Sequence, residues 1–180
     1  MKALVAGYGT LLSRESLART LGEAAVRAKR FVPVWIEGHR RLFNVRPPYY
    51  RGTAPSAAEA AHNLEPAAGA RCNAVVFLAT LDELALLDER ERGYERTAVA
   101  LQTFEDSQPF GRAFAYLAPP ASPWIERDPS RLQPLPRDLA WSRAGAAALG
   151  PYFLAHFEAT TFLADGCTPV QSAQPPGVRV

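Results

Sequence analysis

Near its N-terminus the chain contains Ala3-Leu4-Val5-Ala6-Gly7-Tyr8-Gly9-Thr10-Leu11, an apolar run that ends in a glycine turn. A short apolar run bounded by glycines is typical of a buried strand, and we predict one over residues 2–7. Gly9 allows the chain to turn where a side chain would clash, and the amides after it can point at a carboxylate or an oxyanion. Taken alone, the motif is explained more simply as a tight turn into a helix, which we expect over residues 14–21.

The same turn lacks the features of two common phosphate-binding loops. No Gly-Lys-Ser/Thr follows it, and Leu12 stands where a dinucleotide fingerprint has its third glycine. No Gly-x-Ser-x-Gly elbow occurs in the chain, so the sequence does not suggest covalent catalysis by a serine.

Residues 80–93 predict an amphipathic helix. Thr80 and Glu83 form a capping box at its start, and Gly93 ends it. The residues that share its apolar face are Leu81, Leu84 and Leu87. Arg90 is predicted to lie away from this face.

Glu91 falls within the apolar face, where the pattern calls for another leucine. Burial raises the pKa of a carboxylate, and the C-terminal end of a helix acts in the same direction. A carboxylate with a raised pKa is suited to moving protons near neutral pH. Two alternatives stay open: Asp88 is a rival for the inward position, or Glu91 lies at a frayed helix end and pairs with Arg92 or Arg96.

Two tyrosines are further candidate ligand-binding residues. Tyr94 directly follows the glycine that ends the helix, where it can be oriented beside Glu91, and Tyr116 lies in a predicted strand. A tyrosine hydroxyl in an apolar site offers one directional donor to a ligand. The alternative, for Tyr116 above all, is an aromatic core residue with a solvated tip.

The sequence predicts no metal site and no cofactor. The histidines lack metal-binding spacing, and we expect them at the surface or as hydrogen-bonded core residues; they are His39, His62 and His156. The two cysteines, Cys72 and Cys167, are expected to be free thiols, although a disulfide between them is possible.

The composition is that of an ordinary globular protein, with 48% apolar and 21% charged residues in 180. We expect a single domain over residues 1–165 and an irregular tail over 166–180. The net charge of +2 does not indicate a nucleic-acid or membrane partner, and no secretory signal or membrane span is evident, so we expect a cytoplasmic protein. Seven basic residues could form a basic rim, but solvated positions at strand edges explain them more simply: Arg27, Lys29, Arg30, Arg40, Arg41, Arg46 and Arg51.

The remaining chain is a mixture of strand and helix signals. Strand signals within 26–45 are interrupted by Pro33 and Gly38, which suggests either a bend or two strands. Further strands are expected over 73–79, 95–104 and 112–118. Residues 46–70 are expected to form a surface excursion, 119–136 a proline-rich crossing, and 137–149 and 151–159 helices. Because the strands mostly follow one another, this order favours an α+β fold with a small, strongly curved sheet or barrel.

Together these motifs resemble the γ-glutamylcyclotransferase-like superfamily, which includes the ChaC and AIG2-like branches. Tyr8-Gly9-Thr10-Leu11 is similar to its Tyr-Gly-Ser/Thr loop, and Leu87-Asp88-Glu89-Arg90-Glu91 to its Leu-Asp-x-x-Glu helix end. Gly93-Tyr94 and Ala115-Tyr116-Leu117 are similar to two tyrosine positions of its pocket, and the segment from Gly38 to Asn44 resembles its Gly-x-x-x-x-Phe-Asn pattern.

The resemblance implies a small mixed β-barrel with flanking helices, and an enzyme that releases 5-oxoproline from a small γ-glutamyl substrate. Glu91 would be the catalytic acid/base. The substrate-binding residues would be Tyr8, Gly9, Thr10, Leu11, Tyr94 and Tyr116, with backbone amides of residues 9–12 holding the glutamyl carboxylate. In many cyclotransferases serine stands where this chain has Thr10, and Leu12-Ser13-Arg14-Glu15 replaces the basic turn usual in the AIG2-like branch, so the branch and the leaving group stay open.

Two other classes of function are compatible with the residues. One is a module on the same fold that binds a small carboxylate without turnover. The other is a structural or interaction protein, which predicts no pocket between residues 8–12 and 91–94.

Overall fold

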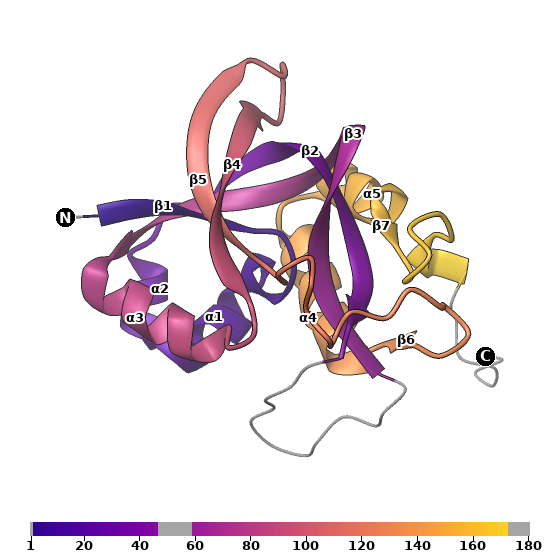
Figure 1. Ribbon diagram of the computed structural model, residues 1–180. Coiled ribbons are helices and arrows are strands. Elements are labelled where there is room, and N and C mark those ends of the chain that lie inside the picture. The colour runs from indigo at the N-terminus through magenta and orange to yellow at the C-terminus, as the bar shows by residue number, and fades with distance from the viewer. Residues whose placement is uncertain (1, 47–58, 173–180) are drawn as a thin grey trace, which may run out of the picture.

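A computed structural model of the protein describes residues 2–46 and 59–172 (Figure 1). The strands are β1 (Lys2–Gly7), β2 (Val32–Val45), β3 (Glu59–Thr80), β4 (Glu95–Thr103), β5 (Pro109–Leu117), β6 (Gln133–Pro134) and β7 (Thr161–Phe162). The α-helices are α1 (Arg14–Leu21), α2 (Glu23–Arg27), α3 (Leu81–Arg90), α4 (Pro136–Ala148) and α5 (Pro151–Ala159). Two 3-10 turns are η1 (Thr10–Leu12) and η2 (Val170–Ser172).

The five longer strands close into a ring. The hydrogen-bonded order is β3-β1-β5-β4-β2, and β2 pairs again with β3 to complete the circuit. The β1–β5 pair is parallel and the other four pairs of the ring are antiparallel. The predicted fold class, a small mixed β-barrel with flanking helices, is therefore confirmed.

Residues 5–7 of β1 and 72–77 of β3 are buried on both faces, as their apolar composition predicts. Ala6 and Val76 point into the ring, among residues that are mostly small or β-branched. On the opposite faces, Val5 and Phe77 pack against the helices α1 and α3, and Val75 packs against α4 and α5. Figure 1 shows α1, α2 and α3 grouped together beside β1.

The prediction of a surface excursion over 46–70 was wrong for residues 59–70, which form the first half of β3. Their polar and small residues give little strand signal, but the backbone pairs with β2 through Arg40 opposite Glu65 and Leu42 opposite Asn63. Long-range pairing of this kind overrides weak local propensity. Residues 47–58 lie outside the described part of the chain.

Of the two alternatives for the strand signals within 26–45, a bend or two strands, the structure has one strand, β2. Pro33 is accommodated within β2, and the register against β3 shifts between Glu37 and His39. Gly38 lies at this shift with φ +70°, a conformation that favours glycine. A short helix, α2, precedes the strand and was not predicted.

Arg41 was expected at a solvated strand edge, and this prediction was wrong, because its side chain is fully buried. Its guanidinium donates to Thr161 Oγ1 at 2.8 Å, to Asn73 Oδ1 at 3.1 Å and to the carbonyl oxygen of Asn73. The alternation along β2 directs this arginine inward, where side-chain and backbone oxygens accept from its two Nη atoms. Its Nε is buried and has no hydrogen-bond partner among residues 2–46 and 59–172. Arg51 lies outside the described residues.

The capping box of α3 is present: Glu83 N donates to Thr80 Oγ1, and Thr80 N donates to Glu83 Oε2. The apolar face is narrower than predicted, because Leu81 is 52% exposed while Leu84 and Leu87 are buried. In the C-terminal part, Val170 is buried against Phe43 and neighbouring residues, so residues near η2 pack on the fold.

Candidate active site

A cavity of about 730 Å³ lies where β1 ends, beside the C-terminal end of α3 and the first turn of α4. Its volume is within the range of small-molecule sites, about 300–1,000 Å³. All seven predicted site residues line it: Tyr8, Gly9, Thr10, Leu11, Glu91, Tyr94 and Tyr116. The other walls include Ser16, Arg19 and Thr20 from α1, His62 from β3, Arg90 from α3, and Arg137, Asp138 and Trp141 from α4.

The loop after β1 turns tightly into η1. The amide of Leu12 donates to Gly9 O at 2.9 Å, and the amide of Ser13 donates to Thr10 O at 3.2 Å. The expectation that amides 9–12 all face a ligand was therefore wrong for Leu12, because the 3-10 turn uses its donor. The amides of Thr10 and Leu11 precede these turn bonds and have no such intrahelical acceptor.

Glycines hold this loop between two elements. A Cβ atom on Gly9 would lie 3.0 Å from the Cβ and Cγ atoms of His62. A Cβ atom on Gly145 of α4 would lie 2.5 Å from the carbonyl carbon of Leu12. The backbone of the loop thus approaches α4 at a distance that only a glycine at position 145 permits, and a side chain at position 9 would require His62 to shift.

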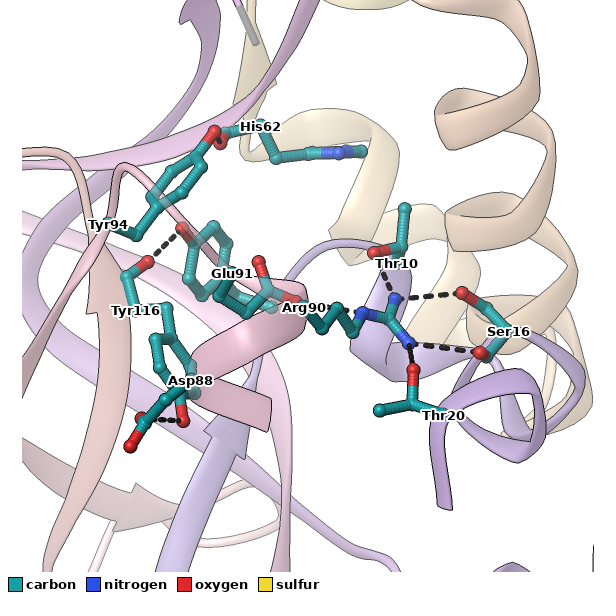
Figure 2. A network of polar contacts seen from close by, with 10 residues as sticks. Thr10, Ser16, Thr20, His62, Asp88, Arg90, Glu91, Tyr94 and Tyr116 are labelled. Atoms are coloured by element: carbon teal, nitrogen blue, oxygen red, sulfur yellow. Dashed lines mark hydrogen bonds and ion pairs between the residues drawn. The ribbon is translucent and has the colours of Figure 1, made fainter. Parts of the chain in front are cut away.

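Arg90 connects α3 to the loop and to α1 (Figure 2). Its Nη2 donates to Thr10 Oγ1 at 2.8 Å and to Ser16 Oγ at 2.9 Å, and its Nη1 donates to Ser16 O and Thr20 Oγ1. Its Nε donates to Glu91 Oε1 at 2.9 Å, which completes the five donors of a guanidinium. Arg90 was predicted to lie away from the apolar face of the helix; its side chain is nevertheless only 17% exposed, because it folds over α1 and contacts polar groups there.

Glu91 caps the C-terminal end of α3 rather than continuing the helix. Its side chain is 18% exposed and pairs with Arg90, not with Arg92 or Arg96 as the alternative prediction proposed. Figure 2 shows the carboxylate of Glu91 beside Arg90, with one oxygen directed into the space bordered by Thr10 and His62. Burial raises the pKa of Glu91, and the charge of Arg90 opposes part of that rise.

The rival carboxylate, Asp88, is exposed and belongs to a different set of contacts. It forms an ion pair with Arg96 at 3.1 Å and accepts a hydrogen bond from the Tyr116 hydroxyl at 2.8 Å. Figure 2 shows Tyr116 and Asp88 together on the side of α3 away from Arg90. Asp88 does not line the described cavity.

The three tyrosine hydroxyls already donate to protein acceptors. Tyr8 donates to the carbonyl oxygen of Tyr116, Tyr94 donates to that of His62 at 2.7 Å, and Tyr116 donates to Asp88. The expectation of a hydroxyl donor free for a ligand is therefore corrected. Each oxygen can still accept a hydrogen bond. Burial raises the pKa of Tyr8 and Tyr94 well above its usual value, so both phenols stay protonated even in alkaline solution.

His62 is neither at the surface nor hydrogen-bonded, contrary to prediction. It is 6% exposed, and neither ring nitrogen has a hydrogen-bond partner among residues 2–46 and 59–172. Its ring lies 3.9 Å from that of Phe43, centroid to centroid. Burial, assisted by the charge of Arg41, lowers the pKa of His62 well below its usual value, so the ring is neutral at pH 7.

Asp138 supplies a second carboxylate to the cavity from the first turn of α4. It is 9% exposed, and burial raises its pKa to about 6, with the charge of Glu91 adding to the shift. Near the mouth, Arg19 and Arg137 both lie over the ring of Trp141, at 5.1 and 4.7 Å from its centroid. These contacts join α1 to α4.

Several absences were found within the part of the chain that the structure describes. No group of three histidine, cysteine, aspartate or glutamate side chains is arranged to hold a metal ion. No helix there has both the length and the apolar character needed to cross a membrane. Both cysteines are free thiols, Cys72 buried and Cys167 exposed.

Arg90, His62 and Asp138 are among the cavity residues that sequence reasoning missed. The first two carry weak signals, a cation next to the candidate acid and a histidine in a segment without clear periodicity. Asp138 lies about fifty residues from Glu91 in a different helix, and nothing in the local sequence connects the two. Only the packing of α4 on η1 and α1 brings it to the site.

The closed ring, with its buried carboxylates in one small cavity, defines an α+β barrel protein with a site for a small molecule. Residues 5–143 match the family described as "Gamma-glutamyl cyclotransferase, AIG2-like", and the chain belongs to that family. No curated protein matches the sequence.

Solved structures share the fold at low sequence identity. A structure described as "Gamma-glutamyl cyclotransferase" aligns with a TM-score of 0.67 at 17% identity, covering 89% of this chain and 88% of its own. An uncharacterised protein from Homo sapiens, loc79017, aligns with a TM-score of 0.65 at 17% identity, covering 88% of each chain. YkqA from Bacillus subtilis aligns with a TM-score of 0.66 at 13% identity, covering 93% of this chain and 55% of its own. At these identities the likeness concerns the fold.

Proposed function

We propose that the protein is a γ-glutamyl cyclotransferase that releases 5-oxoproline and a free amine or amino acid from a γ-glutamyl compound. One observation carries the proposal: Glu91, with its raised pKa, lines the same small cavity as the loop Tyr8–Leu11. Membership of the family supports the reaction class. The leaving group is not specified by the family.

The reaction needs no nucleophile from the protein. The α-nitrogen of the glutamyl group bonds to its own γ-carbon, and the γ-amide carbon–nitrogen bond breaks. For such tethered groups, effective molarities reach about 10⁵ M or more, so the site must mainly hold the chain folded back. Amides of the loop after Gly9 would bind the glutamyl carboxylate, and Tyr94 and Tyr116 would shape the wall behind it.

Proton transfer is the remaining task. The α-ammonium has three protons, the product lactam keeps one, and the leaving nitrogen needs two more to depart as an ammonium. Glu91 would carry these protons from one nitrogen to the other, since its pKa is raised by burial toward the range where it can both accept and donate. Its pairing with Arg90 fixes the carboxylate while leaving one oxygen for the substrate.

The proposal is tested by incubating the protein with glutathione, γ-glutamyl dipeptides and γ-glutamyl-lysine and measuring 5-oxoproline. Glu91→Gln keeps the shape and removes the titrating group, and we expect kcat to fall by about 10²–10⁴-fold. Glu105→Gln, at an exposed position between β4 and β5, is the matched control and should retain full activity. Failure of every substrate, or full activity in Glu91→Gln, would exclude the mechanism.

The second candidate, a module that binds a small carboxylate without turnover, predicts a different outcome. Ligand binding would be detected by calorimetry, but no 5-oxoproline would form. The free carboxylate oxygen of Glu91 in the cavity favours the enzyme over this candidate.

A further inference from the structure

Asp138 is a buried carboxylate that the proposed proton transfer does not use. It lines the cavity with only 9% of its surface exposed. Its backbone carbonyl accepts from Ser142 Oγ at 2.7 Å, but no donor in residues 2–46 or 59–172 makes a hydrogen bond to its carboxylate. A carboxylate that is largely buried, lines a cavity and has no protein donor is stabilised by a cation bound beside it, so this position is suited to a cationic ligand.

The charges around Asp138 differ from those around Glu91. The ionised groups that act on it are Arg137 in α4 and Arg90 and Glu91 at the end of α3, and Tyr94 also interacts with it. Arg90 directs all five donors elsewhere, including one to Glu91. Since the pKa of Asp138 is about 6, this carboxylate is mostly ionised at pH 7.

We propose that Asp138 binds the α-ammonium of the γ-glutamyl substrate and so makes a free α-amine a requirement for tight binding. This inference rests on the proposed function. The glutamyl α-carbon carries a carboxylate and an ammonium. Amides of the loop would bind the carboxylate, and a negative group in the same cavity is needed to bind the ammonium. Because an ammonium has three donors, it can contact Asp138 while another proton faces Glu91.

The test compares two ligands in the Glu91→Gln protein, which should bind without turnover. The ligands are γ-glutamyl-alanine and glutaryl-alanine, which lacks only the α-ammonium. Adding Asp138→Asn should raise the Kd of γ-glutamyl-alanine by about tenfold or more, as expected for loss of a charge-assisted hydrogen bond. The Kd of glutaryl-alanine should change by no more than about twofold. In the active enzyme, Asp138→Asn should raise KM more than it lowers kcat.

Asp138→Ser serves as a second variant, and Asp82→Asn, exposed on α3, is the control that should change neither Kd. Thermal unfolding of each variant checks that it is folded. An equal rise in the Kd of both ligands, or no change in either Kd, would overturn the role of Asp138. Formation of 5-oxoproline by the unmodified enzyme would still support the proposed function in that case. If the enzyme forms no 5-oxoproline from any substrate, the proposed function fails, and this inference fails with it.

Discussion

The cavity has two acidic walls, and they are built differently. At the end of α3, Glu91 pairs with Arg90, whose other donors reach Thr10, Ser16 and Thr20. In the first turn of α4, Asp138 is more deeply buried and accepts no hydrogen bond at its carboxylate within the described residues. A basic partner holds a carboxylate in place and limits the rise of its pKa. A carboxylate without such a partner carries the full cost of burial and can still bind a cation.

The largest effect is expected from Arg90→Gln, which makes the α3 wall resemble the α4 wall. Glu91 would lose its cation and Thr10, Ser16 and Thr20 their donor, so we expect a loss of about 3–5 kcal/mol in the free energy of unfolding, as when one partner of a buried ion pair is removed. The pKa of Glu91 should rise further, because Arg90 lowers it now. Urea unfolding and the pH dependence of activity measure the two effects.

Arg27→Gln is the matched control, since Arg27 is 83% exposed in its pair with Glu23 and should contribute little. An Arg90→Gln protein with unchanged stability would mean that the hydroxyl contacts around Arg90 contribute nothing net.

A smaller effect of opposite sign is expected from Asp138→Asn without substrate. The folded pKa of about 6 lies above the usual 3.8, so the folded state holds a proton that the unfolded state has lost, and wild-type stability declines as pH rises from about 4 to 6. This shift corresponds to about 3 kcal/mol above pH 6, which sets the upper limit of stabilisation by the substitution. The gain should vanish below pH 4.

Unfolding midpoints at pH 3.5, 5 and 7 would measure this dependence. A gain that is the same at all three pH values would contradict an origin in the charge of Asp138.

The smallest change in the free energy of unfolding is expected from Gly145→Ala, at the contact between α4 and the loop after β1. Gly→Ala in a helix interior normally stabilises by up to about 1 kcal/mol. In Gly145→Ala the new Cβ would meet the backbone of Leu12 at 2.5 Å, so we expect a net destabilisation of about 1–2 kcal/mol instead. Ala147→Gly, at an exposed position of α4, calibrates the helix contribution. An increase in stability on Gly145→Ala would show that α4 can move away from the loop without cost.

Much of the fold could be predicted because its signals are local. The apolar run of β1, the capping box of α3 and the alternation in β4 and β5 each follow from the periodicity of a short segment. The first half of β3 could not be predicted, since Ala-, Gly- and Pro-containing residues 59–70 become a strand only by pairing with β2. The inward position of Arg41 was missed for a related reason: its partners, Asn73 and Thr161, are distant in sequence.

Two features of the site are local: Gly9 turns the chain after a buried strand, and Glu91 follows the apolar face of a capped helix. These are consequences of backbone sterics and helical periodicity, which act over a few residues. The groups that surround Glu91 are brought there by packing between distant elements: Arg90 folds across α1, His62 lies behind Gly9, and Asp138 lines the cavity from α4. Burial and charge set the pKa of a group, and both depend on neighbours that the chain brings together only when the ring closes and α4 packs on the loop.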